Sequence, residues 1–142
     1  MSMHIDHIGL VVPNIEAGIR HWARVFEYRQ LTEVVINEIQ KVKVVFLAKR
    51  GSLDVKLLEP VDPASPIARM GQKGGLHHLC FSCDDLDQEV ARLRQEGLRV
   101  LVEPEPTVAL EGGRMAFVFA KQGLSIELVD SRQRRALLDG KR

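Results

Sequence analysis

Residues 74–97 read GGLHHLCFSCDDLDQEVARLRQEG, and residues 6–31, DHIGLVVPNIEAGIRHWARVFEYRQL, are built to the same plan. Each segment opens with a His, continues through an apolar strand and turns into an amphipathic helix. His7 and His78 lie 71 residues apart, and the same offset relates Ile8 to Leu79, Leu10 to Phe81, Asn14 to Asp85, Ile15 to Leu86, Ile19 to Val90 and Trp22 to Leu93. We interpret the chain as a tandem repeat of two half-domains, neither of which is large enough to bury a good core alone.

Both halves predict the element order β-α-β-β-β. In the first half, Asn14 is placed to cap a helix, and β-branched residues predict strands at residues 5–12, 31–35, 42–47 and 53–58. In the second half, Asp84 or Asp85 caps the helix, Gly97 ends it, and strands are expected at residues 99–102, 115–119 and 124–129.

The 142 residues are expected to form a single domain of class α+β. Its parts are module one at residues 5–59, a proline-containing linker at 60–74, module two at 75–130 and a C-terminal tail at 131–142. We expect the two modules to form an open curved sheet with the helices outside. The tail, rich in basic residues, is interpreted as a solvated or frayed end, with docking at a subunit contact as the alternative.

The charge balance bears on the kind of partner. The chain has 20 basic and 19 acidic residues, which argues against a nucleic-acid groove or a membrane-surface patch and favours a small-molecule substrate. No signal-peptide pattern and no apolar run near the ~20 residues of a membrane span is seen, so a cytoplasmic location is expected. Cys80 and Cys83 form a C-x-x-C inside a predicted strand, where residues three apart point to opposite faces, and are interpreted as packing residues.

The repeat also predicts a site. If equivalent positions of the two modules face each other, four residues meet: His7, Lys56, His78 and Glu127. A single His in a strand is usually only a satisfied polar group, but two at equivalent positions with a Glu at a third favour a metal site. Two imidazoles and one carboxylate suit zinc, iron, cobalt or nickel.

The sequence resembles the vicinal oxygen chelate superfamily, which includes glyoxalase I, methylmalonyl-CoA epimerase, extradiol dioxygenases and bleomycin-resistance proteins. The resemblance covers residues 5 to about 130 and is strongest to the epimerase branch. It is carried by five motifs: Asp6-His7-Ile8, Leu57-Leu58-Glu59-Pro60, Gly74-Gly75-Leu76-His77-His78, Gly112-Gly113-Arg114 and Ile126-Glu127-Leu128. It implies that the second His of the pair, His78, is the ligand, in agreement with the repeat. It also implies a homodimer.

Two positions depart from the family pattern. The family's fourth metal ligand falls on Lys56, and the epimerase's second acid-base Glu falls on Val44. An ammonium ~4 Å from a divalent cation is repelled by roughly 8 kcal/mol at an effective dielectric constant of 20, whereas deprotonating a free Lys at pH 7 costs about 4–5 kcal/mol. If a metal binds, Lys56 is therefore neutral or turned away.

Two states of the site follow, and they separate the functions. In the first, His7, His78 and Glu127 hold a divalent metal, and the resemblance implies an epimerase-like isomerase or a glyoxalase-like lyase in which Glu127 or Lys56 moves a proton next to a carbonyl or thioester. In the second, Lys56 pairs with Glu127, and the chain is a metal-free binding protein of the bleomycin-resistance type. The isomerase or lyase ranks first, the binding protein second and an extradiol-type dioxygenase third.

Overall fold

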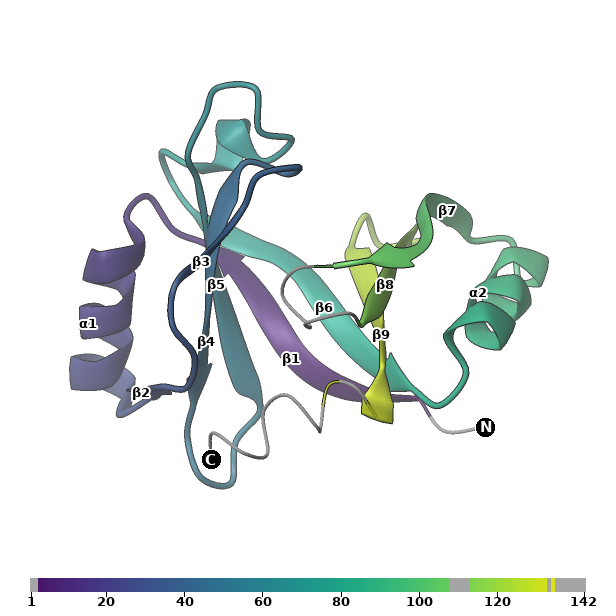
Figure 1. Ribbon diagram of the computed structural model, residues 1–142, viewed down its shortest axis with the longest axis horizontal. Helices are drawn as coiled ribbons and strands as arrows, with labels where there is room; N and C mark the ends of the chain where they lie inside the picture. Colours follow the sequence, from purple (N-terminus) through teal and green to yellow (C-terminus); the bar gives the residue numbers. More distant parts are fainter. Residues whose placement is uncertain (1–2, 108–112, 133, 135–142) are drawn as a thin grey trace. The chain divides into compact units, whose positions relative to one another are not determined.

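A computed structural model describes residues 3–107, 113–132 and 134 and shows an α+β protein (Figure 1). Within these residues the helices are α1 (Ile15–Phe26) and α2 (Leu86–Gln95), with a 3-10 helix, η1, at Ala68–Met70. The strands are β1 (Met3–Val11), β2 (Arg29–Gln30), β3 (Val35–Asn37), β4 (Val42–Ala48), β5 (Asp54–Pro60), β6 (Gly75–Cys83), β7 (Arg99–Pro106), β8 (Arg114–Phe119) and β9 (Ser125–Asp130). The predicted fold class is confirmed.

The chain divides into two compact units. The first unit is His7–His77, and the second unit combines Met1–Asp6 with His78–Arg142. Strand β1 therefore contributes its beginning to the second unit and its remainder to the first.

In the first unit the strands lie in the order β2-β4-β5-β1, and β3 also pairs with β4. Strand β1 runs parallel to β5, whereas β4 is antiparallel to β5. Helix α1 covers one face, where Ile15, Ile19 and Trp22 pack with Val45, Leu47, Val55 and Leu57. Because side chains alternate along a strand, the other face carries His7, Val44, Phe46 and Lys56. The candidate residues of this unit thus point away from the helix.

One predicted strand is broken. Residues 31–35 were expected to form a single strand, but the structure has β2 before them and β3 beginning at Val35. At the break, the Phe46 amide donates a hydrogen bond to the Thr32 hydroxyl at 3.0 Å, where a strand would offer a backbone carbonyl. A side chain that competes with the backbone in this way interrupts the ladder.

The second unit repeats the plan. The strands lie in the order β6-β9-β8-β7, with β6 parallel to β9 and the other pairs antiparallel. Helix α2 packs Leu86, Val90 and Leu93 against Ala116, Val118, Ile126 and Leu128. As in the first unit, neither edge strand closes the sheet, and the His strand and the last strand of the module are adjacent.

The helix starts form as the sequence predicts. The Asn14 side chain accepts a hydrogen bond from the Ala17 amide at 2.8 Å, and Asp85, rather than Asp84, accepts one from the Gln88 amide at 3.0 Å. A carboxylate also supports the start of α1, because Glu59 of β5 accepts a hydrogen bond from the Ile15 amide at 2.7 Å. This bond ties the helix to the end of the strand that carries Lys56.

The C-terminal tail corrects an expectation. Ser131, which is 7% exposed, and Arg134, which is 3% exposed, are not solvated, whereas Arg132 is exposed. Arg134 donates from Nε to Asp6 Oδ2 at 2.6 Å, and the Ser131 hydroxyl bonds to Asp84 at 2.8 Å. Ion pairing with an acidic partner removes the reason for a basic side chain to stay in water. The other tail residues, except Arg132, lie outside the described residues.

The two cysteines behave as packing residues. Cys80 lies with Met115 and Val129, whereas Cys83 lies with Leu86 in the core beneath α2. The two thiols therefore face opposite sides of β6, as predicted. Burial, with nearby carboxylates, raises the pKa of the Cys83 thiol to about 12.

The first prediction concerns Gly74, where φ is +75° and an added Cβ would lie 2.6 Å from the Val11 carbonyl oxygen. Gly51 has a similar φ of +77° but no atom within 4 Å of an added Cβ. Gly51→Ala should cost ~1–2 kcal/mol of unfolding free energy for the left-handed conformation alone. Gly74→Ala should cost clearly more, because the backbone must also move. Urea unfolding measures both, and equal losses would contradict the close contact.

The second prediction concerns the thiols. Because Cys80 and Cys83 are each 0% exposed and thiolate is the reactive form, the native protein at pH 8 should react with iodoacetamide at least ~100-fold more slowly than the same protein in urea. Mass spectrometry of timed samples gives the rate at each thiol. Rapid native labelling at either position would show that β6 is accessible and that the packing described above is wrong.

Candidate functional site

His78 and Glu127 form a buried pair in the second unit. His78 lies on β6, Glu127 lies on the adjacent strand β9, and His78 Nε2 is 3.2 Å from Glu127 Oε1. Their side chains are 1% and 5% exposed. An imidazole and a carboxylate are donors for a divalent transition metal, so the chemistry of this pair fits a metal site.

An aromatic ring fixes the imidazole. Phe117 of β8 pairs with Glu127 in the strand register, and its ring meets the His78 ring edge to face, with centroids 5.5 Å apart and an interplanar angle of 85°. Edge-to-face contacts of this kind hold a ring in one orientation. The Phe117 ring thus packs against His78 beside the Glu127 carboxylate.

The first unit contains a corresponding cluster. The rings of His7 and Phe46 also meet edge to face, at 5.1 Å and 89°. Phe46 pairs with Lys56 across β4 and β5, and Lys56 Nζ lies 5.7 Å from the centre of the Phe46 ring. His7 is 1% exposed and Lys56 is 7% exposed. An ammonium donates hydrogen bonds but offers no lone pair, so Lys56 does not extend the set of metal donors while it is protonated.

The two clusters are equivalent by the repeat. His7 and His78, Phe46 and Phe117, and Lys56 and Glu127 are each separated by 71 residues. The strand registers agree, because Gly9 pairs with Lys56 and Cys80 pairs with Glu127. The two phenylalanines were missed in the sequence analysis, although the same offset relates them and was the available signal.

Val44 is buried among apolar side chains. It is 5% exposed and packs in a cluster with Val11, Val42, Leu58 and Ile67. The position at which the family resemblance places a second acid-base Glu therefore offers no ionisable group, and its surroundings are suited to a hydrocarbon side chain.

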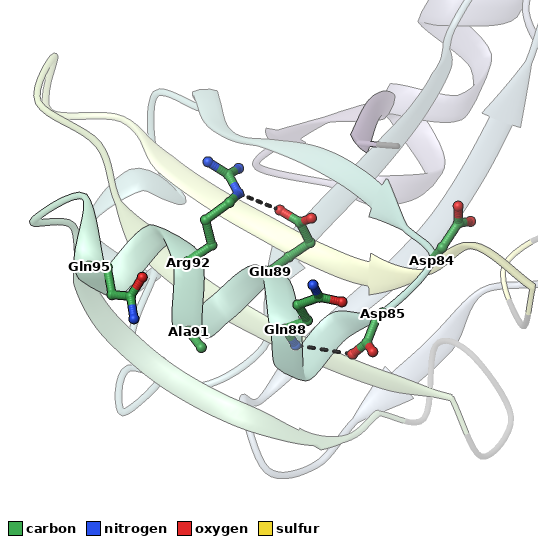
Figure 2. A pocket seen from close by; sticks show the side chains of 7 residues that line it. All are labelled: Asp84, Asp85, Gln88, Glu89, Ala91, Arg92 and Gln95. Atoms are coloured by element: carbon green, nitrogen blue, oxygen red, sulfur yellow. Dashed lines mark hydrogen bonds and ion pairs between the residues drawn. The ribbon is translucent and has the colours of Figure 1, made fainter. Parts of the chain in front are cut away.

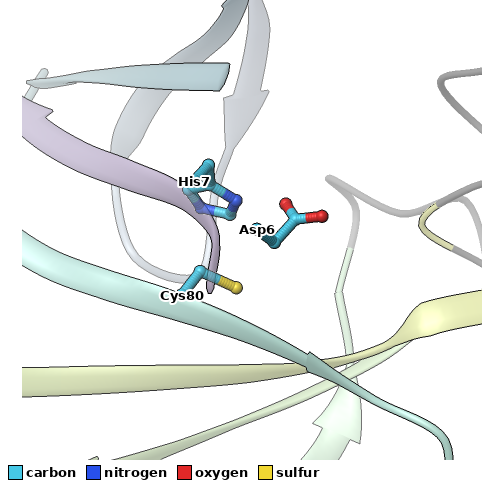
Figure 3. A group of neighbouring side chains, drawn as sticks. All are labelled: Asp6, His7 and Cys80. Carbon is cyan, nitrogen blue, oxygen red and sulfur yellow. The ribbon is translucent and has the colours of Figure 1, made fainter. Parts of the chain in front are cut away.

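A second acidic group lies near the start of β1. Figure 3 shows Asp6 with the neighbouring His7 and with Cys80, whose sulfur lies within 4.8 Å of the Asp6 carboxylate. The Asp6 carboxylate accepts a hydrogen bond from the buried Arg134 guanidinium at 2.6 Å. This charge-assisted bond gives Asp6 a structural partner.

A hollow beside α2 has an acidic lining. Figure 2 shows its residues, Asp84, Asp85, Gln88, Glu89, Ala91, Arg92 and Gln95. Two of the carboxylates stabilise α2 itself. Asp85 caps the helix, and Glu89 accepts a hydrogen bond from Arg92 Nε at 3.0 Å. A hollow whose charges support its own helix is a weaker candidate than the buried pair on β6 and β9.

Among the described residues, no helix is long and apolar enough to cross a membrane.

Comparison with known proteins relates most of the chain to methylmalonyl-CoA epimerases, among other proteins. A 29% identical relative, the ethylmalonyl-CoA/methylmalonyl-CoA epimerase of Cereibacter sphaeroides, aligns over 90% of this chain and 98% of its own length. The methylmalonyl-CoA epimerase of Mycobacterium tuberculosis is 30% identical, with a TM-score of 0.78 over 89% of this chain and 86% of that one. A Streptomyces coelicolor methylmalonyl-CoA epimerase variant in complex with 2-nitronate-propionyl-CoA is 28% identical, with a TM-score of 0.79 over 90% and 94%.

The model of the glyoxalase/bleomycin resistance protein/dioxygenase superfamily matches residues 6–119, which include three of the four candidate site residues. This match and the structural likeness confirm the resemblance first drawn from the motifs. The chain belongs to the glyoxalase/bleomycin resistance protein/dioxygenase superfamily.

Proposed function

We propose that this protein is an epimerase-type isomerase that moves a proton at the carbon next to the carbonyl of a coenzyme A thioester. The observation that carries the proposal is the buried pair of His78 and Glu127, 3.2 Å apart. It occurs in a chain whose relatives over about 90% of its length include methylmalonyl-CoA epimerases. A buried carboxylate on a rigid strand is suited to accept a proton from carbon.

The ligand of the Streptomyces coelicolor relative supports this chemistry. That protein binds 2-nitronate-propionyl-CoA. A nitronate is planar and negatively charged, as is the enolate that forms when a thioester loses its α-proton. Enzymes bind such mimics because their sites are complementary to charge that develops during the reaction. A related site in this chain would bind the same class of compound.

We further propose that His7, His78 and Glu127 together hold a divalent metal: zinc, cobalt, nickel or iron. Support comes from the donor types, from the complete burial of both histidines and from their equivalence in the repeat. A bound divalent metal would polarise the thioester carbonyl and stabilise negative charge on its oxygen. Lys56 is not a member of the ligand set.

Glu127 is the group that we propose moves the proton. Its carboxylate takes the α-proton of the thioester, and the electrons of the broken C–H bond enter the enolate. A proton delivered to the opposite face of that carbon gives the other epimer, and the proton on Glu127 returns to solvent. His78 Nε2 lies 3.2 Å from this carboxylate, and the Phe117 ring meets the His78 ring edge to face. Burial excludes the water that would compete for the proton.

A second function is favoured by one observation. Lys56 is buried on the same face of its sheet as His7 and contacts the Phe46 ring. A fixed ammonium could neutralise the Glu127 carboxylate in place of a metal ion, and the chain would then bind a small molecule without transforming it. The two functions differ in whether a proton on carbon exchanges with solvent.

The third prediction uses this difference. The protein, supplied with zinc or cobalt in D₂O, should replace the α-proton of methylmalonyl-CoA by deuterium, and Glu127→Gln should slow this exchange ~10²–10⁴-fold. Glu103→Gln is the matched control, because Glu103 is an exposed carboxylate on β7 that pairs with Arg94. Mass spectrometry measures the deuterium content. Binding of methylmalonyl-CoA without exchange above the uncatalysed rate would favour the metal-free binding protein.

A further inference from the structure

A hollow in the first unit lies where the linker between the modules meets the ends of β1 and β5. Its volume is about 530 Å³, and its lining includes Pro13, Pro60, Asp62, Pro63, Arg69 and Gly71. We propose that this linker hollow binds the phosphate-bearing end of coenzyme A, with Arg69 contacting a phosphate group. The inference rests on the proposed function, because it assigns a place to the part of the thioester substrate that does not react.

The charges of the linker favour an anion. Among the described residues, Arg69 and Lys73 take part in no ion pair, and both are exposed. The nearby carboxylate of Asp62 is already engaged, since it accepts a hydrogen bond from the Ala64 amide at 2.7 Å and lies 3.7 Å from Lys41 Nζ. A guanidinium binds phosphate through two parallel hydrogen bonds, so Arg69 is the side chain of this lining best suited to that contact.

The walls of the hollow are held in place by the linker itself. Gly71 packs so closely on Pro60 that an added Cβ would lie 2.7 Å from the Pro60 Cγ atom. The Gly71 amide donates to the Ala68 carbonyl at 3.1 Å, and the Ser65 hydroxyl donates to the Gln40 carbonyl at 2.9 Å. Small-molecule sites have volumes of roughly 300–1,000 Å³ and mostly apolar walls with a few polar groups. The linker hollow is therefore suited to a nucleotide group, whose base is flat and whose phosphates are charged.

The linker lies over the face of the sheet that carries His7. Ile67 of the linker packs in a cluster with Val44, which is on that face. His7 pairs with Asp54, and Pro60 lies six residues further along β5, roughly 20 Å away at the usual rise of a strand. Coenzyme A requires such a separation, because a long pantetheine arm joins its reactive thioester to its diphosphate.

Two other hollows fit this ligand less well. The acidic hollow beside α2 would repel phosphate through its carboxylates. A hollow on α1 carries Arg20, His21 and Arg24, but α1 packs on the opposite face of the sheet from His7. A thioester held by that helix would have to pass around the edge of the sheet to bring its carbonyl to His7. The linker hollow satisfies the requirements of both charge and position.

Calorimetric titration with coenzyme A itself tests the contact without relying on turnover. Arg69→Gln should raise the Kd for coenzyme A ~10-fold, because a hydrogen bond to a charged group contributes a factor of about this size. Arg69→Lys keeps the charge and should raise the Kd less. Added salt should weaken binding to the wild-type protein more steeply than binding to Arg69→Gln, since the variant has lost a charge that faces phosphate. Circular dichroism checks that each variant is folded.

Exchange of the α-proton in D₂O separates the handle of the substrate from its reacting end. With methylmalonyl-CoA, Arg69→Gln should raise KM ~10-fold at constant kcat, because the contact is made equally before and during the reaction. With methylmalonyl-pantetheine, which lacks the phosphates and the adenosine, neither parameter should change. Arg24→Gln is the matched control, because Arg24 is an exposed arginine on the hollow of α1 and should leave both substrates unaffected.

The outcomes distinguish this inference from the function on which it rests. An unchanged Kd for coenzyme A in Arg69→Gln, or an equal loss with both thioesters, would overturn the assignment. So would an equal loss in Arg24→Gln, or a wild-type protein that binds no coenzyme A. If the wild-type protein bound coenzyme A through Arg69 but exchanged no α-proton, the linker hollow would stand as a coenzyme A site and the proposed epimerase function would be rejected.

Discussion

Parallel pairing between the first and last strands of each module is the constraint on which the rest of the structure depends. A parallel pair needs a long crossover connection, and here the crossover supplies the helix and the middle strands. The pairing places His7 beside the strand of Lys56, and His78 beside the strand of Glu127, across 49 residues of sequence in each case. The site residues are therefore held by backbone hydrogen bonds rather than by flexible loops.

The same strand pairing explains why the two units carry matching clusters of side chains that differ in the charged residue. Each unit buries a His and a charged residue at matching positions, and in each a Phe at the matching position meets the His ring edge to face. In one unit the charged residue is a carboxylate, and in the other it is an amine. The repeated module thus carries side chains of opposite charge type at equivalent positions.

Much of this arrangement is readable in the sequence. The offset of 71 residues predicted the repeated element order and the equivalence of His7 with His78 and of Lys56 with Glu127, because a repeat constrains strand register as well as element order. The break near Thr32 was not predictable, since it depends on a hydroxyl that meets the Phe46 amide 14 residues away. Nor was the burial of Arg134, whose partner Asp6 lies 128 residues away. From composition alone, a basic side chain such as that of Arg134 is expected to lie in solvent.

Our central proposal is that His7, His78 and Glu127 are ligands of one divalent metal ion. Calorimetric titration of the apo protein with cobalt tests it most directly, using wild type, His7→Ala and His78→Ala. Since loss even of an outer-shell partner weakens metal binding ~10–100-fold, each substitution should raise the Kd by at least ~100-fold. If His78→Ala weakened binding while His7→Ala left the Kd unchanged, the two histidines would not serve the same ion, and the account of the site would be wrong.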